Sequence, residues 1–399
     1  MNQQKNKTER IHSLDSLRAI MMLLGLVLHS ALTYNITNHG NAWGIKDPKS
    51  NYILTDFLVL FIHSFRMPIF FLVAGFFGSM LFYERGVVNM LKNRVWRIIF
   101  PFIIFLFLLS PIIYFSFSYT NAVFENQENP FITTIQLFSN IVVFLPKTTS
   151  HLWFLYYLIF TTLISVLLGL LCEKLKIDNR ISNTFNWLIQ KPVIRVLFFS
   201  TFTFFILSSL ETSMINASVS LIPDLSTFVY YFFFYIIGWI LFKSKNLLNN
   251  FMKYDWQCTF LAVTLVITQG LLIQYSGMKL NPNSNSTILI LFNSLIVWLF
   301  IFGITGLFIR YSSKHSKIMR YISDSSYWVY LIHLPLTAII PAFIWELPIP
   351  ALGKFIIVLV LTTLICFVTY HYLVRSTFIG KFLNGKKYLK KKKPVGNIV

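Results

Sequence analysis

Apolar residues in this chain occur in long runs, and short polar segments separate the runs. A helix that crosses a lipid bilayer needs about 20 mostly apolar residues. Windows of this kind lie at 17–36, 54–82, 98–117, 152–172, 193–210, 226–242, 257–275, 287–309, 325–345 and 353–373. The pattern predicts an all-α integral membrane protein with about ten transmembrane helices.

An eleventh apolar window, 131–145, is shorter than the others and is interrupted by polar residues. These residues are Thr133, Thr134, Gln136, Ser139 and Asn140. A segment of this length fits an interfacial or re-entrant helix better than a membrane span. We therefore expect that the chain does not cross the bilayer at this segment.

Composition excludes several other classes of protein. The chain has 399 residues, of which 56% are hydrophobic and only 12% charged, whereas a soluble domain carries about 25% charged residues. No soluble fold of this size buries so much apolar surface, so a soluble enzyme, a secreted disulfide scaffold and a disordered regulator are excluded. Cys172, Cys258 and Cys366 lie in or beside apolar runs and form neither a disulfide framework nor a metal motif.

The positions of the basic residues orient the helices. The net charge is +20, but short cytoplasmic loops of membrane proteins collect Lys and Arg, so the charge needs no nucleic acid to explain it. With an inner N-terminus, the inner segments hold all 34 Lys and Arg residues except Lys46, Lys49, Arg66, Lys147, Lys279 and Lys354. We expect a cytoplasmic segment 1–16, a membrane domain 17–374 and a basic cytoplasmic tail 375–399.

Ionisable residues inside a membrane are costly and therefore mark candidate sites. Arg18 and His29 are eleven residues apart in the first span, which places both on one helical face within about 20° and separates them by about 16 Å along the axis. Asp15 lies three residues before Arg18 and can pair with it. The stripe predicts a polar path from the inner surface to the middle of the membrane. The alternative is that His29 is a structural histidine bonded to a neighbouring helix.

Two further groups of basic residues stand out. Arg94 and Arg97 are spaced i, i+3 at the inner mouth of the third span, a pattern that suits phosphate but also ordinary positive-inside charge. In the second span, His63 and Arg66 lie near the middle of the membrane. We expect Arg66 to point inward, toward Asp56 or a substrate, with a purely structural ion pair as the alternative.

Two histidines lie near span ends. Residues 323–325 are predicted to cap the ninth span, so that His333 lies about two turns into the helix. His151 opens the fourth span at its outer end and is followed by aromatic residues from Trp153 to Tyr157. These aromatics favour a membrane-interface belt, with a sugar-stacking platform as the alternative.

Five segments in this order resemble a known family. They are "LDSLRAIMMLLGLVLH", "FRMPIFFLVAGF", "RVWR" followed by Pro101, "HLWFLYYL" and "SYWVYLIHLPL". Together they resemble the membrane acyltransferase-3 family from about residue 11 to 375. The outer segment Trp43–Ser50 and the length favour the branch associated with succinyl groups on periplasmic glucans. Many members have Glu and Pro after the last span, where this chain reads "YLVRST".

The resemblance implies a ten-span enzyme of the bacterial inner membrane. It transfers an acyl group, succinyl or acetyl, from cytosolic acyl-CoA to sugar hydroxyls of a periplasmic or cell-surface glycan. His29 is implied to be essential for transfer, and Arg18, Arg94 and Arg97, with Asp15 beside them, to bind the donor. Neither a metal nor a permanently bound cofactor is implied.

His29 suits a general base or, alternatively, a covalent acyl carrier. Candidates for orienting it or stabilising an oxyanion are His333 and Arg66. The acceptor-side candidates are His63, His151 and Trp153. Expected partners are acyl-CoA, a glycan and the lipid bilayer, without nucleic acid; a homo-oligomer stays open. The alternatives are an O-acetyltransferase of lipopolysaccharide or exopolysaccharide, and a polytopic transporter without chemistry.

Overall fold

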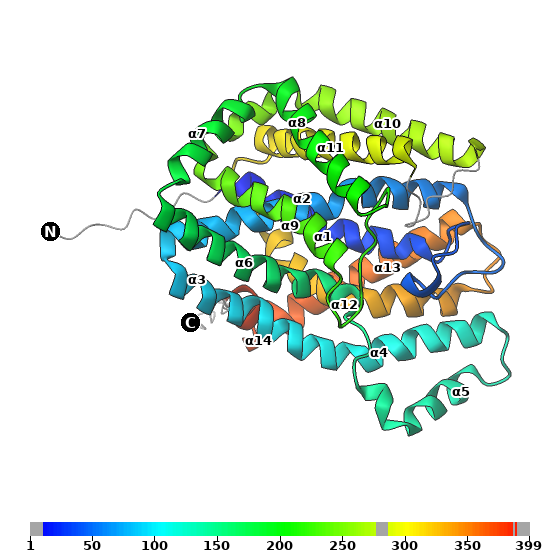
Figure 1. Ribbon diagram of the computed structural model, residues 1–399. Helices are drawn as coiled ribbons and strands as arrows, with labels where there is room; N and C mark the ends of the chain where they lie inside the picture. Colours follow the sequence, from blue (N-terminus) through cyan, green and yellow to red (C-terminus); the bar gives the residue numbers. More distant parts are fainter. Residues whose placement is uncertain (1–10, 277–285, 386–387, 389–399) are drawn as a thin grey trace, which may run out of the picture.

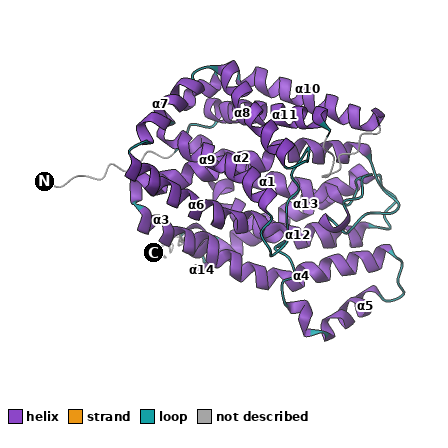
Figure 2. Ribbon diagram, viewed as in Figure 1, coloured by secondary structure: helices purple, strands orange, loops and turns teal. Residues whose placement is uncertain are grey.

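The computed structural model describes residues 11–276, 286–385 and 388. Their regular structure is entirely helical (Figure 2). The α-helices are α1 (His12–Leu32), α2 (Ile53–Arg85), α3 (Val87–Arg94), α4 (Phe100–Phe124), α5 (Pro130–Gln136), α6 (Trp153–Leu175), α7 (Asp178–Ile189), α8 (Pro192–Ser209), α9 (Leu225–Lys243), α10 (Asp255–Ser276), α11 (Thr287–Tyr311), α12 (Lys317–Ile344), α13 (Ala351–Thr369) and α14 (Phe378–Asn384). A π-helical turn, Val95–Ile99, joins α3 to α4.

Ten helical segments in the described residues are long and apolar enough to cross a membrane. They coincide with the ten predicted windows, and α3, the π-turn and α4 together form the third, Val87–Phe124. The prediction of an all-α, ten-helix membrane protein is therefore confirmed. The 131–145 window is not among the ten, since it contains only α5 and short 3₁₀ turns. In Figure 1, α5 lies beside α4 at the edge of the bundle.

The central helices of the bundle are α1, α2, α11 and α12, whose apolar windows are more than half buried. By contrast, α8 and α10 are mostly exposed and lie at the periphery (Figure 1). Because the candidate site residues of the first, second and ninth spans belong to central helices, they lie inside the protein, not against lipid. The polar stripe predicted on α1 thus belongs to one of the central helices.

Helices α2 and α9 cross in close backbone contact. A Cβ atom on Gly75 of α2 would overlap the carbonyl of Tyr235, and one on Gly238 of α9 would overlap the carbonyl of Leu72. Small residues at such a crossing let two membrane helices approach closely. The crossing fixes how the aromatic side chains of α9 meet the polar side chains of α2.

The ninth span begins earlier than the sequence predicted. Helix α12 starts at Lys317, and its N-cap is Ser316, whose side chain accepts a hydrogen bond from Met319 N. Residues 323–325 therefore lie inside the helix and do not cap it, and His333 lies deep in α12 instead of two turns from its start. The error arose because the polar turn before 325 looked like a loop, whereas it continues the helix beyond the apolar window.

The bundle has two faces that are named here by their residues. The arginine face is the end at which α1 begins; it carries Arg18, Arg94 and Arg97. The loop face is the opposite end, at which α1 ends; it carries the loop 33–52 and the segment 210–224. An even number of crossings returns the end of α13 to the arginine face.

Candidate active site in the middle of the bundle

Three histidines from three separate helical segments meet inside the bundle. His29 comes from α1, His333 from α12, and His151 from a 3₁₀ turn directly before α6. The ring centroids of His29 and His333 lie 5.3 Å apart, and those of His333 and His151 also lie 5.3 Å apart. His151 and His333 are buried, while His29 keeps partial exposure. The accessible imidazole of the three is therefore the one on α1.

A proline in α12 explains how His151 is held. Proline has no N–H, so Pro335 leaves the carbonyl of Leu331, four residues earlier, without its helical hydrogen bond. His151 Nε2 lies 2.9 Å from this carbonyl oxygen. The Tyr330 hydroxyl also donates to the carbonyl of His151, at 2.7 Å. The sequence placed His151 at the outer end of its span, but these bonds fix it against the middle of α12.

The contacts of the two buried histidines define their tautomers. His333 Nδ1 lies 2.7 Å from the carbonyl oxygen of Tyr330 and 3.1 Å from that of Val329. Because carbonyl oxygens only accept, His333 Nδ1 and His151 Nε2 must carry the protons. The opposite nitrogens, His333 Nε2 and His151 Nδ1, are buried without a partner among the described residues. Each neutral ring thus keeps an unused hydrogen-bond acceptor.

Trp43 covers His29 from the loop face. Its ring stacks on the imidazole at a centroid distance of 5.5 Å and an angle of 28°. Its indole Nε1 donates to Thr33 Oγ1 at 3.1 Å, and its edge meets Phe117 at 5.0 Å. Trp43 is 3% exposed. The sequence offered this residue only as part of a branch marker, since nothing in its spacing connects it to His29.

A buried ion pair holds the loop that carries Trp43. Lys354 Nζ lies 3.1 Å from Asp47 Oδ2, and both side chains are almost fully buried. The same ammonium donates to the carbonyl of Trp345 at 2.8 Å. Asp47 Oδ1 accepts the backbone N–H groups of Lys49 and Ser50. A paired and fully hydrogen-bonded buried charge of this kind fixes one loop geometry.

Arg66 lies one helical turn from His29, on the neighbouring helix. A Cβ atom on Gly25 would come 2.7 Å from Arg66 Nη1, so the guanidinium occupies the space that this glycine leaves open. Arg66 interacts electrostatically with the phenols of Tyr231 and Tyr330 and with His29. Among the described residues, no carboxylate pairs with it. A buried cation without a counter-ion is available to a negative charge on a substrate.

Asp56 is not the partner of Arg66 that the sequence suggested. Its two carboxylate oxygens accept the backbone N–H groups of Ile36 and Thr37, at 2.8 and 3.0 Å. Asp56 lies in the first turn of α2, about 15 Å along the helix from Arg66. The expectation failed because ten residues of one helix separate the two groups, a distance that no side chain bridges.

The arginine face gathers three guanidinium groups. Arg18 interacts electrostatically with both Arg94 and Arg97. Its guanidinium pairs with the Asp15 carboxylate at 3.3 Å and lies over the ring of Phe77 at 5.3 Å. Arg94 is interior, and its Nε and Nη2 atoms are buried without a hydrogen-bond partner among the described residues. Guanidinium groups held together in this way are able to bind an anion.

The π-turn changes the predicted relation of Arg94 and Arg97. Arg94 ends α3 and lies beside the hydroxyl of Tyr235, near Gly78. Arg97 lies within the π-turn, and its Nη1 donates to the carbonyl of Leu383 at 3.2 Å. The two side chains therefore diverge, whereas spacing alone placed them on one α-helical face. They still border the same space, since Arg18 faces both.

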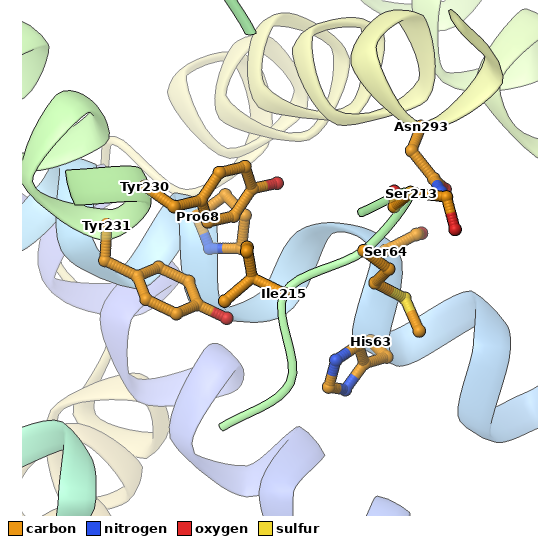
Figure 3. Close-up of a pocket in the computed structure, with 9 residues that line it drawn as sticks. His63, Ser64, Pro68, Ser213, Ile215, Tyr230, Tyr231 and Asn293 are labelled. Atoms are coloured by element: carbon orange, nitrogen blue, oxygen red, sulfur yellow. The ribbon is translucent and has the colours of Figure 1, made fainter. Parts of the chain in front are cut away.

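The acceptor-side candidates His63, His151 and Trp153 lie in different surroundings in the structure. His63 lines a pocket on the loop-face half of the bundle (Figure 3). Trp153 is buried, with its ring 5.3 Å from that of Tyr231 and 6.3 Å from that of Phe71. The interface-belt interpretation is wrong for Trp153 and for the fully buried Tyr157. Only His63 of the three candidates lines this pocket.

The described residues include no group of three or more His, Cys, Asp or Glu side chains placed to hold a metal ion. The three histidines bond to backbone carbonyls or stack on rings, as described above. The chemistry that this arrangement offers is proton transfer and charge stabilisation by imidazole and guanidinium groups. These features define a polytopic membrane protein with a cluster of imidazole and guanidinium groups inside its helical bundle.

Comparison with known proteins identifies the class more closely. The model of the acyltransferase-3 family, described as an acyltransferase domain, matches residues 11–371. Glucans biosynthesis protein C of Escherichia coli O1:K1 / APEC is 27% identical over 350 residues, which cover 84% of each chain. The protein of the same name from Salmonella schwarzengrund is 24% identical over 392 residues, or 96% of each chain. No solved structure matches this chain significantly.

The chain therefore belongs to the acyltransferase-3 family, and it is a multi-pass membrane acyltransferase. The resemblance that the five sequence segments suggested is confirmed over most of the chain.

Proposed function

We propose that this protein is an O-acyltransferase of the bacterial inner membrane that moves an acyl group from acyl-CoA to a sugar hydroxyl. The donor binds at the arginine face and the acceptor approaches from the loop face. The observation that carries the proposal is the position of His29, which lies about three turns along α1 from Arg18 of the arginine face and stacks on Trp43 at the loop-face side. The names of the relatives favour a glucan as acceptor, and the family resemblance implies succinyl or acetyl as the acyl group.

The donor side follows from charge. Coenzyme A carries several phosphate charges, and Arg18, Arg94 and Arg97 are the guanidinium groups that the bundle gathers at this face. Guanidinium groups bind phosphate with charge-assisted, often bidentate hydrogen bonds. With the phosphates held there, the pantetheine arm extends along α1, and the thioester reaches the level of His29. The same orientation puts the arginine face and both chain termini in the cytoplasm, in keeping with the positive-inside rule.

The reaction needs a base and a stabilised oxyanion. We propose that His29 accepts the proton of the sugar hydroxyl as its oxygen attacks the thioester carbonyl. The new C–O ester bond forms, the C–S bond breaks, and the coenzyme A thiolate receives the proton from the imidazolium. Arg66, one turn from His29, stabilises the oxyanion of the tetrahedral intermediate. His333 positions the His29 ring. In the alternative route His29 carries the acyl group covalently before the sugar attacks.

A biochemical assay tests the proposal. Purified protein is incubated with succinyl-CoA or acetyl-CoA, and free coenzyme A is measured with and without a β-glucan oligosaccharide. We expect release that depends on the acceptor and is lost in His29→Ala protein of unchanged size-exclusion profile. No release with either donor would favour a transporter without chemistry.

A second experiment identifies the substrates in the cell. Mass spectrometry of periplasmic and envelope glycans compares cells with and without the gene. A mass difference confined to the periplasmic glucan names the acyl group and supports this acceptor. A difference confined to lipopolysaccharide or exopolysaccharide would replace the glucan by that alternative acceptor.

A further inference from the structure

The pocket shown in Figure 3 lies between α2, α9, α11 and the segment that follows α8. Its lining residues are His63, Ser64, Pro68, Ser213, Met214, Ile215, Tyr230, Tyr231 and Asn293. Because the segment after α8 belongs to the loop face, the pocket lies on the acceptor side of the bundle. Lys, Arg, Asp and Glu are absent from its lining, in contrast to the arginine face.

Hydrogen bonds hold the segment after α8 in place. Asn293 Nδ2 donates to the carbonyl of Ser213 at 2.6 Å, and Gln269 Nε2 donates to Asn293 Oδ1 at 2.9 Å. Ser213, Gln269 and Asn293 are all buried. Two buried amides are thus used to place one stretch of irregular backbone inside the bundle. Irregular backbone at membrane depth is expected only where it lines a cavity or is enclosed by protein.

Polar groups of the lining remain unused. Ser213 is fully buried, and its Oγ atom has no hydrogen-bond partner among the described residues. His63 Nε2 is likewise buried without a partner. Tyr230 and Tyr231 extend from α9 toward the segment of Ser213 and Ile215 (Figure 3). Buried polar groups without partners are rare in proteins, and here two of them belong to residues that line the same pocket.

The pocket is adjacent to the reaction centre. Helices α1 and α2 are antiparallel, and Arg66 lies against Gly25. Moving four residues outward along α1 reaches His29, and moving three residues outward along α2 reaches His63. The two imidazoles are therefore at the same depth, and they interact electrostatically. Tyr231 belongs both to the pocket and to the surroundings of Arg66.

The size of the pocket limits what it can hold. Its free space is about that of a single water molecule. A sugar ring does not fit such a space, whereas the hydroxyl oxygen at the end of a one-carbon arm does, with the carbon of the arm at the mouth of the pocket. Neutral donors and acceptors beside aromatic rings match an uncharged alcohol, and a cationic group is disfavoured because Arg66 lies next to His63 and Tyr231 of the lining.

We propose that this pocket binds the exocyclic hydroxymethyl group of a neutral hexose unit of the acceptor. This inference rests on the proposed function, which supplies the sugar acceptor. The hydroxymethyl group exchanges hydrogen bonds with Ser213, Tyr231 and His63, and the sugar ring stays outside the pocket, toward His29. Asn293 is a positioning residue that acts through the backbone of Ser213.

A binding measurement without acyl donor tests the subsite. Purified protein is titrated with a β-linked glucose oligosaccharide and with the matching xylose oligosaccharide, which lacks the hydroxymethyl group. We expect the glucose compound to bind at least about tenfold more tightly, since the xylose compound leaves buried polar groups unpaired. Tyr231→Phe and Ser213→Ala should each remove most of this ratio, and Tyr114→Phe, on the exposed side of α4, should preserve it.

The outcomes separate the two proposals. Equal binding of the two oligosaccharides by the unaltered protein, or a ratio unchanged in both pocket variants, would overturn the subsite. Binding of neither compound by a preparation that acylates glucan would also overturn it. A preserved binding ratio in a protein that transfers no acyl group would leave the subsite standing while the proposed function failed.

Discussion

The two faces of the bundle differ in the charge of the side chains that they present. The arginine face assembles Arg18, Arg94 and Arg97 with few carboxylates near them. The loop face contains a buried ion pair, Asp47–Lys354, which holds a loop closed. It offers neutral groups in the pocket. In the proposed function, one face binds a polyanion and the other an uncharged partner, with His29 between them.

The largest effect is expected where the two faces meet. Replacing His29 by Ala removes the only accessible imidazole of the histidine cluster, and a positioned acid–base group contributes about 10²–10⁴-fold to a rate. We expect acyl transfer to fall by that factor while coenzyme A binding, measured by isothermal titration, stays intact. His315→Ala, in an exposed turn, is the matched control. Unchanged acyl transfer in the His29 variant would show that His29 is not the acid–base group between the two faces.

The next effect concerns the arginine face alone. Arg94→Ala should raise the KM for acyl-CoA about 10- to 100-fold, because a hydrogen bond to a charged group contributes about 1.5–3 kcal/mol. The KM for the sugar acceptor should not change. Lys92→Ala, an exposed neighbour of the same charge, should leave both constants unchanged. If Arg94→Ala raised the acceptor KM instead, the division of labour between the faces would be wrong.

The ion pair of the loop face is expected to affect acyl transfer less than Arg94 does, although it affects stability more. Lys354→Met leaves the Asp47 carboxylate buried and unpaired, which costs about 3–5 kcal/mol. Thermal unfolding in detergent should therefore occur at a lower temperature, and acyl-CoA hydrolysis without acceptor should rise as Trp43 loosens over His29. The double variant Asp47→Asn, Lys354→Met should recover part of the stability. A double variant less stable than the single one would contradict this role.

The smallest effect is a pH dependence of the same loop. Burial lowers the pKa of His39, which the Asp56 carboxylate opposes and Lys46 reinforces. The closed loop thus favours the neutral ring, which accepts a hydrogen bond from Asn35. As the pH falls below the ordinary histidine pKa of about 6.5, the opened loop binds a proton more readily, so closure weakens. Hydrogen exchange of residues 35–51 should accelerate at pH 5.5 relative to pH 7.5, and His39→Gln should reduce this difference.

The sequence predicted well whatever depends on the length of apolar runs and on local spacing. The ten spans, the short segment 131–145 and the shared inward face of Arg18 and His29 follow from one helical period and from the thickness of a bilayer. These features are properties of single helices, so no knowledge of neighbouring helices is needed to predict them.

Contacts between helices could not be predicted in the same way. The stacking of Trp43 on His29 and the bond from His151 to the carbonyl freed by Pro335 join residues far apart in the chain. The free carbonyl itself was predictable, since every helix proline leaves one. Its partner was not, because only the tertiary placement of the 3₁₀ turn Ser150–Leu152 beside α12 decides which side chain arrives there. The error over Asp56 has the same origin.

The close crossing of α2 and α9 makes α9 a rigid link between the two cations of the site. Tyr231 reaches Arg66, and Tyr235, one turn further along, reaches Arg94. A displacement of this single helix must therefore change both surroundings together. Binding at the donor side can in this way be coupled to the acceptor pocket through a displacement of α9, in which the two tyrosines are about one helical turn apart. Gly75 and Gly238 lie at the close contact about which α9 would move relative to α2.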